Sequence, residues 1–419
     1  MDTSPLPSPS QPRRCCFIIS SHIHFARNRL ILEEIKKHPN LKLQIAVAAS
    51  AILPQYGDVL PDLEKAGFTP DATIRMTLAG GCPVAMAKTA GIGVTEFATA
   101  FDNLKPDIVI IRGDRYEVLS AAIAASYMNI PVAHIEGGDS TGSIDESVRH
   151  AVTKLAHIHF PTNEISKKRI LQMGEDPSFV HDVGAPEVEV AARHMAEIVP
   201  EEINIHGVGV PIDFTKPYLL VLHHPVTTDM GGNREKTNIL LHAIESFGLQ
   251  TIWFWPNVDA GTDEVAKAIR VFREKEHPEH MHFLKYVPSD AFLALLKNCA
   301  CLIGNSSAGI KESSFFGTPT INVGNRQEGR LHGANVVDCD YNHNKLVQAV
   351  EKQLEQKRYE PSSIYYKEEC SKHVADILAM SPLYTQKHFR TQYAPEELDQ
   401  MESAPSRSEQ QSQLRNPSL

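Results

Sequence analysis

Three carboxylates, Asp114, Glu136 and Asp145, fall just past short apolar runs in the first half of the chain, and basic residues stand beside each of them. A positioned carboxylate can take a proton from carbon or return one, and a sugar-like substrate needs a base on one face and an acid on the other. These three residues are therefore the candidates for proton transfer. The alternative is that Asp145 only caps the N-terminus of a helix and Asp114 only pairs with Arg115.

A second candidate site is the stretch 303–309, IGNSSAG, which ends a predicted strand and opens a predicted helix. Small residues there let backbone N–H groups and the hydroxyls of Ser306 and Ser307 approach a phosphate at the positive helix end. Glu312, one to two turns inside the helix, could accept both ribose hydroxyls of a nucleotide. The same stretch could equally be an N-cap without a ligand.

Two series of strand-like runs are expected to position these residues. Helical patterns separate the runs, and the runs are apolar without a period of two, which is typical of parallel strands covered by helices on both faces. Ligands of such sheets bind beyond the carboxyl ends of the strands. The runs are 16–20, 43–49, 107–113, 132–138 and 157–160 in the first series, and 218–224, 251–256, 282–287, 301–305 and 320–324 in the second.

The division of the chain follows from the gap between the two series. Residues 200–217 carry prolines and glycines with few periodic apolar positions, so they are predicted to link a domain at 15–199 to one at 218–380. Pro- and Ser-rich residues 1–14 are predicted to be a disordered tail, and 381–419 a C-terminal extension whose last part is disordered. The predicted fold class is α/β, with two doubly wound parallel-sheet domains facing a central cleft.

Composition excludes several classes of protein. The 419 residues include 41 basic and 51 acidic ones, a formal charge of -10, which argues against a general affinity for nucleic acid or anionic membranes. No run approaches the about 20 apolar residues of a membrane helix. Seven cysteines without a CxxC pair favour the reducing cytoplasm, and the absence of an HExxH motif gives no reason to expect a metal.

Seven motifs occur in a specific order over about residues 107–340. They are GDRYE (113–117), HIEGGDSTGSIDESVRHAVTKLAHIHF (134–160), LHHPVTTD (222–229), PNVDAG (256–261), KYVPSD (285–290), IGNSSAGIKE (303–312) and GNRQEGR (324–330). In these motifs the sequence resembles the hydrolysing UDP-N-acetylglucosamine 2-epimerases, including the epimerase half of the bifunctional animal enzyme. The resemblance implies a GT-B fold, a second domain that holds most of the nucleotide, and a homodimer or homotetramer.

The resemblance also implies roles for individual residues. Catalysis is expected from Asp114, Glu136, Asp145 and His224, the last of these near the diphosphate. The residues expected to contact the UDP-sugar are Arg115 near the diphosphate, Arg149, Asn257, Tyr286 and Val287 near uracil, Ser306 and Ser307 at the phosphates, Glu312 at the ribose, and Arg326 at the far side of the nucleotide.

The reaction implied by the resemblance removes the C2 proton, expels UDP to give a 2-acetamidoglucal, and adds water to release N-acetylmannosamine. It requires no nicotinamide, other cofactor or metal. Three alternatives stay open: the same reaction on a UDP-2,4-diacetamido-2,4,6-trideoxy sugar, a GT-B glycosyltransferase, and a non-catalytic UDP-sugar-binding protein.

Three positions depart from the family pattern. Ile23 stands where the family has an arginine near the diphosphate, Ala51 stands where a histidine is common, and Arg112 replaces the usual histidine before Gly-Asp-Arg. One hypothesis is that Arg112 supplies the cation lost at Ile23, because both follow strands that border the same cleft. The alternative is that Arg112 points outward or pairs with a carboxylate such as Asp114.

Overall fold

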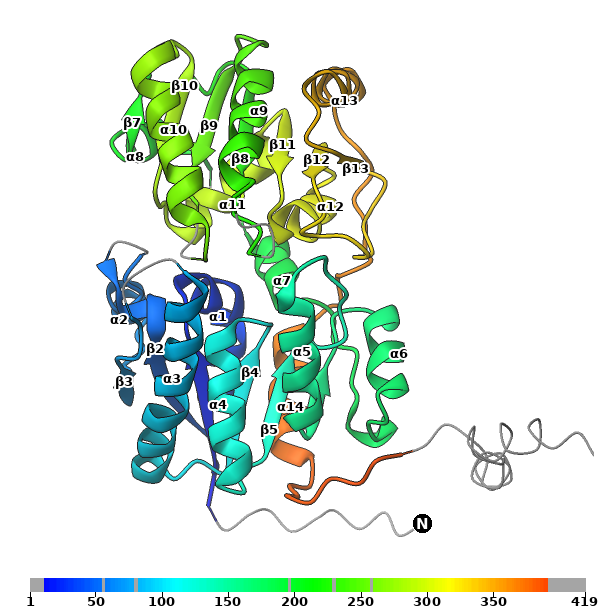
Figure 1. Cartoon of the computed structure of the whole chain (residues 1–419). Coiled ribbons are helices and arrows are strands. Elements are labelled where there is room, and N and C mark those ends of the chain that lie inside the picture. The colour runs from blue at the N-terminus through cyan, green and yellow to red at the C-terminus, as the bar shows by residue number, and fades with distance from the viewer. Residues whose placement is uncertain are drawn as a thin grey trace, which may run out of the picture.

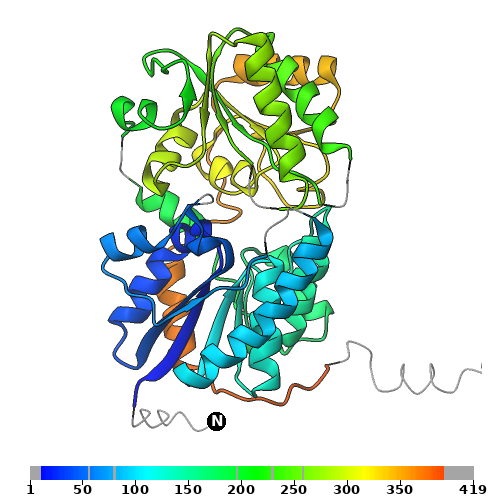
Figure 2. The same ribbon diagram turned by 60° about the vertical axis from the view of Figure 1, so that its left-hand side comes forward.

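The chain folds into two α/β domains, one above the other in Figure 1, each with helices on both faces of its sheet (Figure 2). The structure, a computed structural model, describes residues 11–54, 57–78, 82–194, 197–227, 231–256 and 259–390. The predicted class, a GT-B-like fold of two doubly wound domains, is confirmed.

The first domain is built on six parallel strands in the order β3-β2-β1-β4-β5-β6. The strands are β1 (Arg13–Ile19), β2 (Leu41–Ala48), β3 (Ala72–Ile74), β4 (Ile108–Arg112), β5 (Val132–Ile135) and β6 (Ile158–Phe160). The helices are α1 (His22–Lys37), α2 (Leu60–Lys65), α3 (Pro83–Leu104), α4 (Tyr116–Tyr127), α5 (Ile144–Leu155), α6 (Glu164–Gln172) and α7 (Pro186–Arg193).

Strand β1 explains why the apolar runs lack a period of two. Cys15 and Phe17 point into one hydrophobic core, which α1 covers, while Cys16 and Ile18 point into the other, which α3 and α4 cover. Alternate side chains point to opposite faces of a strand, and both faces of this sheet are buried, so every position from Cys15 to Ile19 is apolar.

The second domain is built on seven strands in the order β13-β12-β11-β8-β9-β10-β7, in which only β7 is antiparallel to its neighbour. The strands are β7 (Val208–Gly209), β8 (Tyr218–Leu222), β9 (Gln250–Phe254), β10 (Met281–Leu284), β11 (Cys301–Gly304), β12 (Thr320–Val323) and β13 (Val336–Cys339). The helices are α8 (Pro200–Asn204), α9 (Asn233–Glu245), α10 (Thr262–Glu276), α11 (Ser289–Asn298), α12 (Glu312–Phe316) and α13 (His343–Gln356).

The domain boundaries differ from the predicted ones. Strand β1 begins at Arg13, inside the predicted tail, and β7 lies inside the predicted linker. The larger difference is helix α14 (Cys370–Met380), which was predicted in the second domain. Its residues Val374 and Leu378 pack instead in the hydrophobic core of the first domain, with residues of α1. An amphipathic pattern shows that a helix has an apolar face but does not show which sheet it covers.

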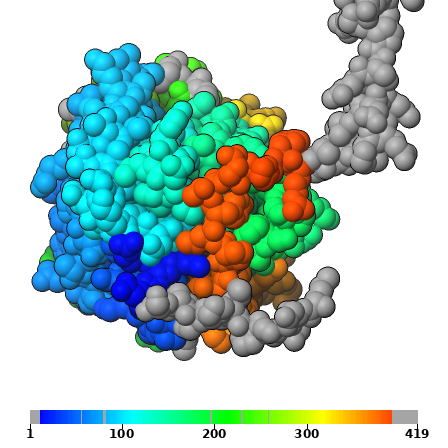
Figure 3. All heavy atoms as spheres, turned by 90° about the horizontal axis from the view of Figure 1, so that it is seen from below, coloured from blue at the N-terminus to red at the C-terminus, as the bar shows by residue number. Residues whose placement is uncertain are grey.

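Beyond α14 the chain continues along the first domain, where Figure 3 shows it in orange to red on the underside. Lys387 fixes this segment: its Nζ lies 2.6 Å from Glu175 Oε2 and donates to the carbonyl oxygen of Lys154 at 2.8 Å. No helix among the described residues has the length and apolar character to cross a membrane.

Helix α14 gives a direct test of its domain assignment. Leu378→Ala should lower the free energy of unfolding by about 2–5 kcal/mol, because Leu378 is fully buried and truncation leaves a cavity in the first-domain core. Met380→Ala, at a 67% exposed position of the same helix, should cost less than about 0.5 kcal/mol. Urea unfolding measures both, and equal losses would contradict the packing of α14.

Candidate active site

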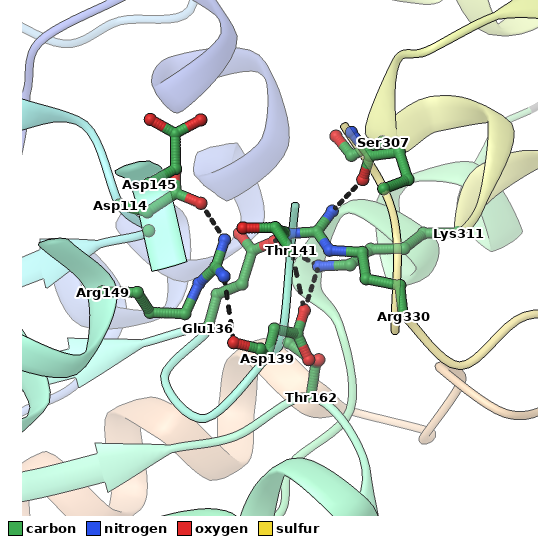
Figure 4. Close-up of polar contacts among 12 residues, drawn as sticks. Asp114, Glu136, Asp139, Thr141, Asp145, Arg149, Thr162, Ser307, Lys311 and Arg330 are labelled. Carbon is green, nitrogen blue, oxygen red and sulfur yellow. Dashed lines mark hydrogen bonds and ion pairs between the residues drawn. The ribbon is translucent and has the colours of Figure 1, made fainter. Parts of the chain in front are cut away.

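Six charged side chains form a buried cluster where the two domains meet, and Figure 4 labels Glu136, Asp139, Lys311 and Arg330 among them. None is more than 8% exposed. Those of the first domain stand at strand ends or in the first turn of α7, and those of the second domain stand just before α12 and in the loop after β12. We call this set the charge cluster; its members are Arg112, Glu136, Asp139, Glu187, Lys311 and Arg330.

Glu136 lies at the centre of the charge cluster. Arg112 Nη2 is 2.8 Å from Glu136 Oε2 and also 2.8 Å from Glu187 Oε1. Lys311 Nζ pairs with Glu136 Oε1 and is 3.1 Å from Glu187 Oε1. Arg330 Nη2 is 3.5 Å from Glu136 Oε1. Glu136 thus contacts three cations, and it shares two of them with Glu187.

The cations determine the protonation state of both glutamates. Burial by itself would raise the pKa of Glu136, but Arg112, Lys311 and Arg330 outweigh burial and hold this pKa well below its usual range. Burial would also raise the pKa of Glu187, but Arg112 and Lys311 outweigh burial and lower this pKa from 4.5 to about 2. The stability that Glu187 contributes is therefore present above about pH 4.5 and is lost as the pH falls towards 2.

The loop after Glu136 requires glycine at two positions. Gly138 has φ +80°, and a Cβ there would collide with the carbonyl oxygen of Ser166. A Cβ on Gly142 would collide with the carbonyl oxygen of Asn325 in the second domain. Gly138 thus allows the loop to pack closely on α6, and Gly142 allows the backbones of the two domains to touch.

His134, from the same motif, connects β5 to the GDR loop. Its Nε2 is 2.9 Å from the carbonyl oxygen of Gly113 and its Nδ1 is 3.1 Å from Thr153 Oγ1. Burial lowers the pKa of His134 to about 4, so the ring is neutral at pH 7. Because a carbonyl only accepts, Nε2 carries the proton and Nδ1 accepts from Thr153.

Asp114 and Asp145 lie on the same side of Arg149 in Figure 4. Arg149, which is fully buried, pairs with Asp114 and donates to the carbonyl oxygen of Asp139 at 3.1 Å. Asp145 is half-buried, and its Oδ2 accepts from Ser143 Oγ at 3.0 Å. The N-cap of α5 is Ser143, so the alternative that Asp145 caps this helix is wrong.

Arg115 pairs with carboxylates other than Asp114. The alternative that Asp114 only pairs with Arg115 is therefore wrong as well. Its Nη2 is 2.9 Å from Glu117 Oε1, and its Nη1 is 3.1 Å from Asp259 Oδ1 in the second domain. Arg326 Nη2 is 4.0 Å from Asp259 Oδ2. The two arginines that were expected near the nucleotide therefore contact one carboxylate.

The stretch after β11 is less helical than predicted. Ser306 caps a single 3-10 turn at Ser307–Gly309, its Oγ accepting from the Ala308 N–H at 3.4 Å, and α12 begins only at Glu312. The predicted helix starting at Ser306 is thus wrong.

Arg27, on α1 of the first domain, contacts this stretch. Its Nη1 donates to Ser307 Oγ at 3.1 Å, and its Nη2 is 3.0 Å from Glu312 Oε1. This contact overturns the hypothesis that Arg112 replaces the cation missing at Ile23. Arg112 is held in the charge cluster, whereas Arg27, one helical turn after Ile23, brings its guanidinium to the predicted phosphate-binding serine. The third departure from the family pattern, Ala51, is fully buried in the first-domain core.

His224 connects the ends of β8 and β11. The backbone N–H of His224 donates to Asn305 Oδ1 at 2.8 Å, and Asn305 Nδ2 donates to the backbone carbonyl of His224 at 2.8 Å. Burial, with Arg326 nearby, lowers the pKa of His224 to about 3, so the imidazole is neutral at pH 7.

The predicted uracil-binding residues lie at the end of β10. Tyr286 donates its hydroxyl hydrogen to Asp62 Oδ2 at 2.6 Å, and Val287 is buried. Asn257 lies outside the described residues.

Five residues that form ion pairs where the two domains meet were not among the site residues predicted from the sequence. Asp139, Lys311 and Arg330 stand inside motifs that the sequence does reveal, so charge within those motifs could have identified them. Arg27 and Glu187 stand in no motif, and only the folded chain brings them to the site.

Within the described ranges no group of three or more histidine, cysteine, aspartate or glutamate side chains is arranged to hold a metal ion.

The two facing doubly wound domains define a protein of the GT-B-like class. A profile of the UDP-N-acetylglucosamine 2-epimerase family matches residues 33–379, so the chain belongs to this family of enzymes.

Several relatives are similar over most of the chain. GDP/UDP-N,N'-diacetylbacillosamine 2-epimerase (hydrolyzing) of Campylobacter jejuni is 32% identical, covering 83% of this chain and 88% of the relative. Polysialic acid biosynthesis protein P7 of Escherichia coli is 30% identical, covering 81% and 85%. UDP-N-acetylglucosamine 2-epimerase of Neisseria meningitidis is 28% identical, covering 84% and 90%.

Solved structures share the fold. The UDP-GlcNAc 2-epimerase of Methanocaldococcus jannaschii, in complex with UDP-GlcNAc and UDP, has a TM-score of 0.73 at 19% identity, covering 88% of this chain and 100% of that one. The Neisseria meningitidis enzyme bound to UDP-GlcNAc has a TM-score of 0.69 at 15% identity, covering 87% and 99%.

The charge cluster can be tested by removing one cation. Lys311→Met should lower the free energy of unfolding by about 3–5 kcal/mol, because it leaves Glu136 and Glu187 with too few buried partners. Lys345→Met removes an exposed lysine that pairs with Asp340 at 3.4 Å and should cost less than about 0.5 kcal/mol. If denaturant unfolding shows similar losses for both, Lys311 is not essential to the cluster.

Proposed function

We propose that the protein is a hydrolysing UDP-N-acetylglucosamine 2-epimerase, which releases UDP and N-acetylmannosamine for the synthesis of sialic-acid-like sugars. The observation that carries the proposal is the position of Asp114, paired with Arg149, and Glu136, paired with Lys311 of the second domain, just after the neighbouring strands β4 and β5. The family match and the names of the relatives support the same reaction class.

The proposed reaction has two steps. A carboxylate takes the C2 proton, the electrons of the C2–H bond form a C1–C2 double bond, and the C1–O bond breaks so that UDP leaves with its electron pair. Water then adds to the C1–C2 double bond of the glucal: its oxygen bonds to C1 and gives one proton to a carboxylate, and C2 receives a proton on the face opposite to the one that lost it. Placed carboxylates serve both proton transfers, and cations stabilise the leaving diphosphate.

Arginines from both domains are proposed to bind the diphosphate. Arg115 and Arg326 already contact the carboxylate of Asp259, and Arg27 already contacts Glu312, so each guanidinium is directed at an anion. Guanidinium groups bind carboxylate and phosphate oxygens with the same geometry. An entering diphosphate can therefore replace Asp259 and Glu312 as their partner.

A second candidate substrate is a UDP-2,4-diacetamido-2,4,6-trideoxy sugar. Two relatives, from Campylobacter jejuni and Legionella pneumophila, are named N,N'-diacetylbacillosamine 2-epimerases (hydrolyzing) and are 32% and 29% identical. The homodimer or homotetramer and the cytoplasmic location stay predictions from the sequence.

The reaction is tested by incubating the protein with each UDP-sugar in D2O and identifying products by NMR. UDP-N-acetylglucosamine should give UDP and N-acetylmannosamine with deuterium at C2. Glu136→Gln and Asp145→Asn should each lose at least about 100-fold in turnover while still binding UDP, as expected for loss of a positioned acid or base. Asp102→Asn, at an exposed position, serves as the control. Near-parental turnover in both variants would refute these roles.

Glu312→Ala tests the nucleotide site. It should weaken UDP binding in calorimetry by about 1.5–3 kcal/mol, the range for a hydrogen bond that involves a charged group. Glu328→Ala, at an exposed position in the loop after β12, should leave the affinity unchanged. Loss of the ion pair between Glu312 and Arg27 would have the opposite effect on UDP affinity, because it frees the Arg27 guanidinium to bind phosphate. Unchanged or tighter binding would mean that Glu312 serves Arg27 rather than the ribose.

A further inference from the structure

Glu187 is the member of the charge cluster that neither the motifs nor the proposed reaction uses. It stands in the first turn of α7, directly after Pro186. Its carboxylate is 1% exposed, and Oε1 alone accepts the ion pairs of both Arg112, at 2.8 Å, and Lys311, at 3.1 Å. The same two cations contact the two oxygens of Glu136.

We infer that Glu187 is a positioning residue for proton transfer by Glu136: it holds Arg112 and Lys311 between two carboxylates, so that neither cation is committed to Glu136 alone. The inference rests on the proposed function, in which Glu136 exchanges a proton with the sugar. Glu187 touches no reacting atom and acts through the two shared cations.

The charges around Glu136 show why it matters that Glu136 and Glu187 share Arg112 and Lys311. Three cations face three carboxylates, all removed from water, and the two nearby histidines, His24 and His134, are held neutral by burial. The charged groups are Arg112, Lys311 and Arg330 against Glu136, Glu187 and Asp139.

Removal of the negative charge of Glu187 would leave the charge cluster with one excess cation. Arg112 and Lys311 would then be paired with Glu136, which would bind a proton less readily. A weaker base removes a proton from carbon more slowly. The positions of Arg112 and Lys311 would also shift, because Arg112 would lose one of its two ion pairs in the charge cluster and Lys311 one of its three. Both effects slow cleavage of the C2–H bond without a change in the nucleotide contacts.

The test is Glu187→Gln, which keeps the size of the side chain and removes its charge. We expect kcat to fall about 10-fold, a part of the full effect of a general base. KM should stay within about two-fold, and the primary isotope effect with C2-deuterated UDP-N-acetylglucosamine should increase, because C2–H cleavage becomes more rate-limiting.

Glu189→Gln is the matched control. Glu189 lies on the same helix, is 2% exposed, and pairs with Arg193 and Ser371 rather than with the charge cluster. If Glu187 only stabilises the fold, as a buried carboxylate of α7, then Glu187→Gln and Glu189→Gln should show the same kinetics and an unchanged isotope effect. That result would overturn the inference.

The double variant Arg112→Gln/Glu187→Gln covers the case in which Glu187→Gln does not fold. It removes one cation and one carboxylate, so the remaining charges balance. We expect it to fold and to turn over more slowly than the parent enzyme, with an isotope effect lower than that of Glu187→Gln, because Glu136 then faces one cation fewer. An isotope effect that does not depend on whether Glu187 is present in the Arg112→Gln background would overturn the inference.

The parent enzyme and Glu136→Gln separate this inference from the proposed function. An inactive parent would refute both. An active parent with an active Glu136→Gln variant would refute the role of Glu136, whereas an inactive Glu136→Gln variant with parental kinetics in Glu187→Gln would refute the role of Glu187 alone.

Discussion

The balance of buried charge where the two domains meet is the constraint on which the rest of the site depends. The first domain contributes Arg112 and the carboxylates of Glu136, Asp139 and Glu187, and the second contributes Lys311 and Arg330. Each set taken alone carries uncompensated charge, and an unpaired buried charge is far more costly than a paired one. The cluster is neutral only when the domains are together, which favours their association.

Further ion pairs connect the domains, among them Arg27 with Glu312 and Arg115 with Asp259. In both, a guanidinium of the first domain meets a carboxylate of the second. An anionic substrate that enters between the domains competes with these carboxylates for the same cations. Each guanidinium would then keep an anionic partner, whereas the carboxylates of Asp259 and Glu312 would need new hydrogen-bond donors.

The ion pairs where the two domains meet explain the departures from the family pattern at Ile23 and Arg112. Arg112 pairs with Glu136 and Glu187 in the charge cluster rather than with the stretch at Ser307. Arg27 provides the cation near Ser307, from a position one helical turn beyond Ile23. The charge near the predicted phosphate site is thus present, although a residue outside the recognised motifs carries it.

The sequence by itself determined the two sheets and the family, because buried strands and ordered motifs are local patterns in the chain. The catalytic roles of Asp114, Glu136 and Asp145 stay predictions. Only the tertiary structure decided that α14 covers the first sheet, and that Arg27 and Glu187 reach the site. Hydrophobic periodicity reports that a helix has a buried face, not which partner buries it. Ion-pair partners are likewise chosen by the packing of segments far apart in the chain.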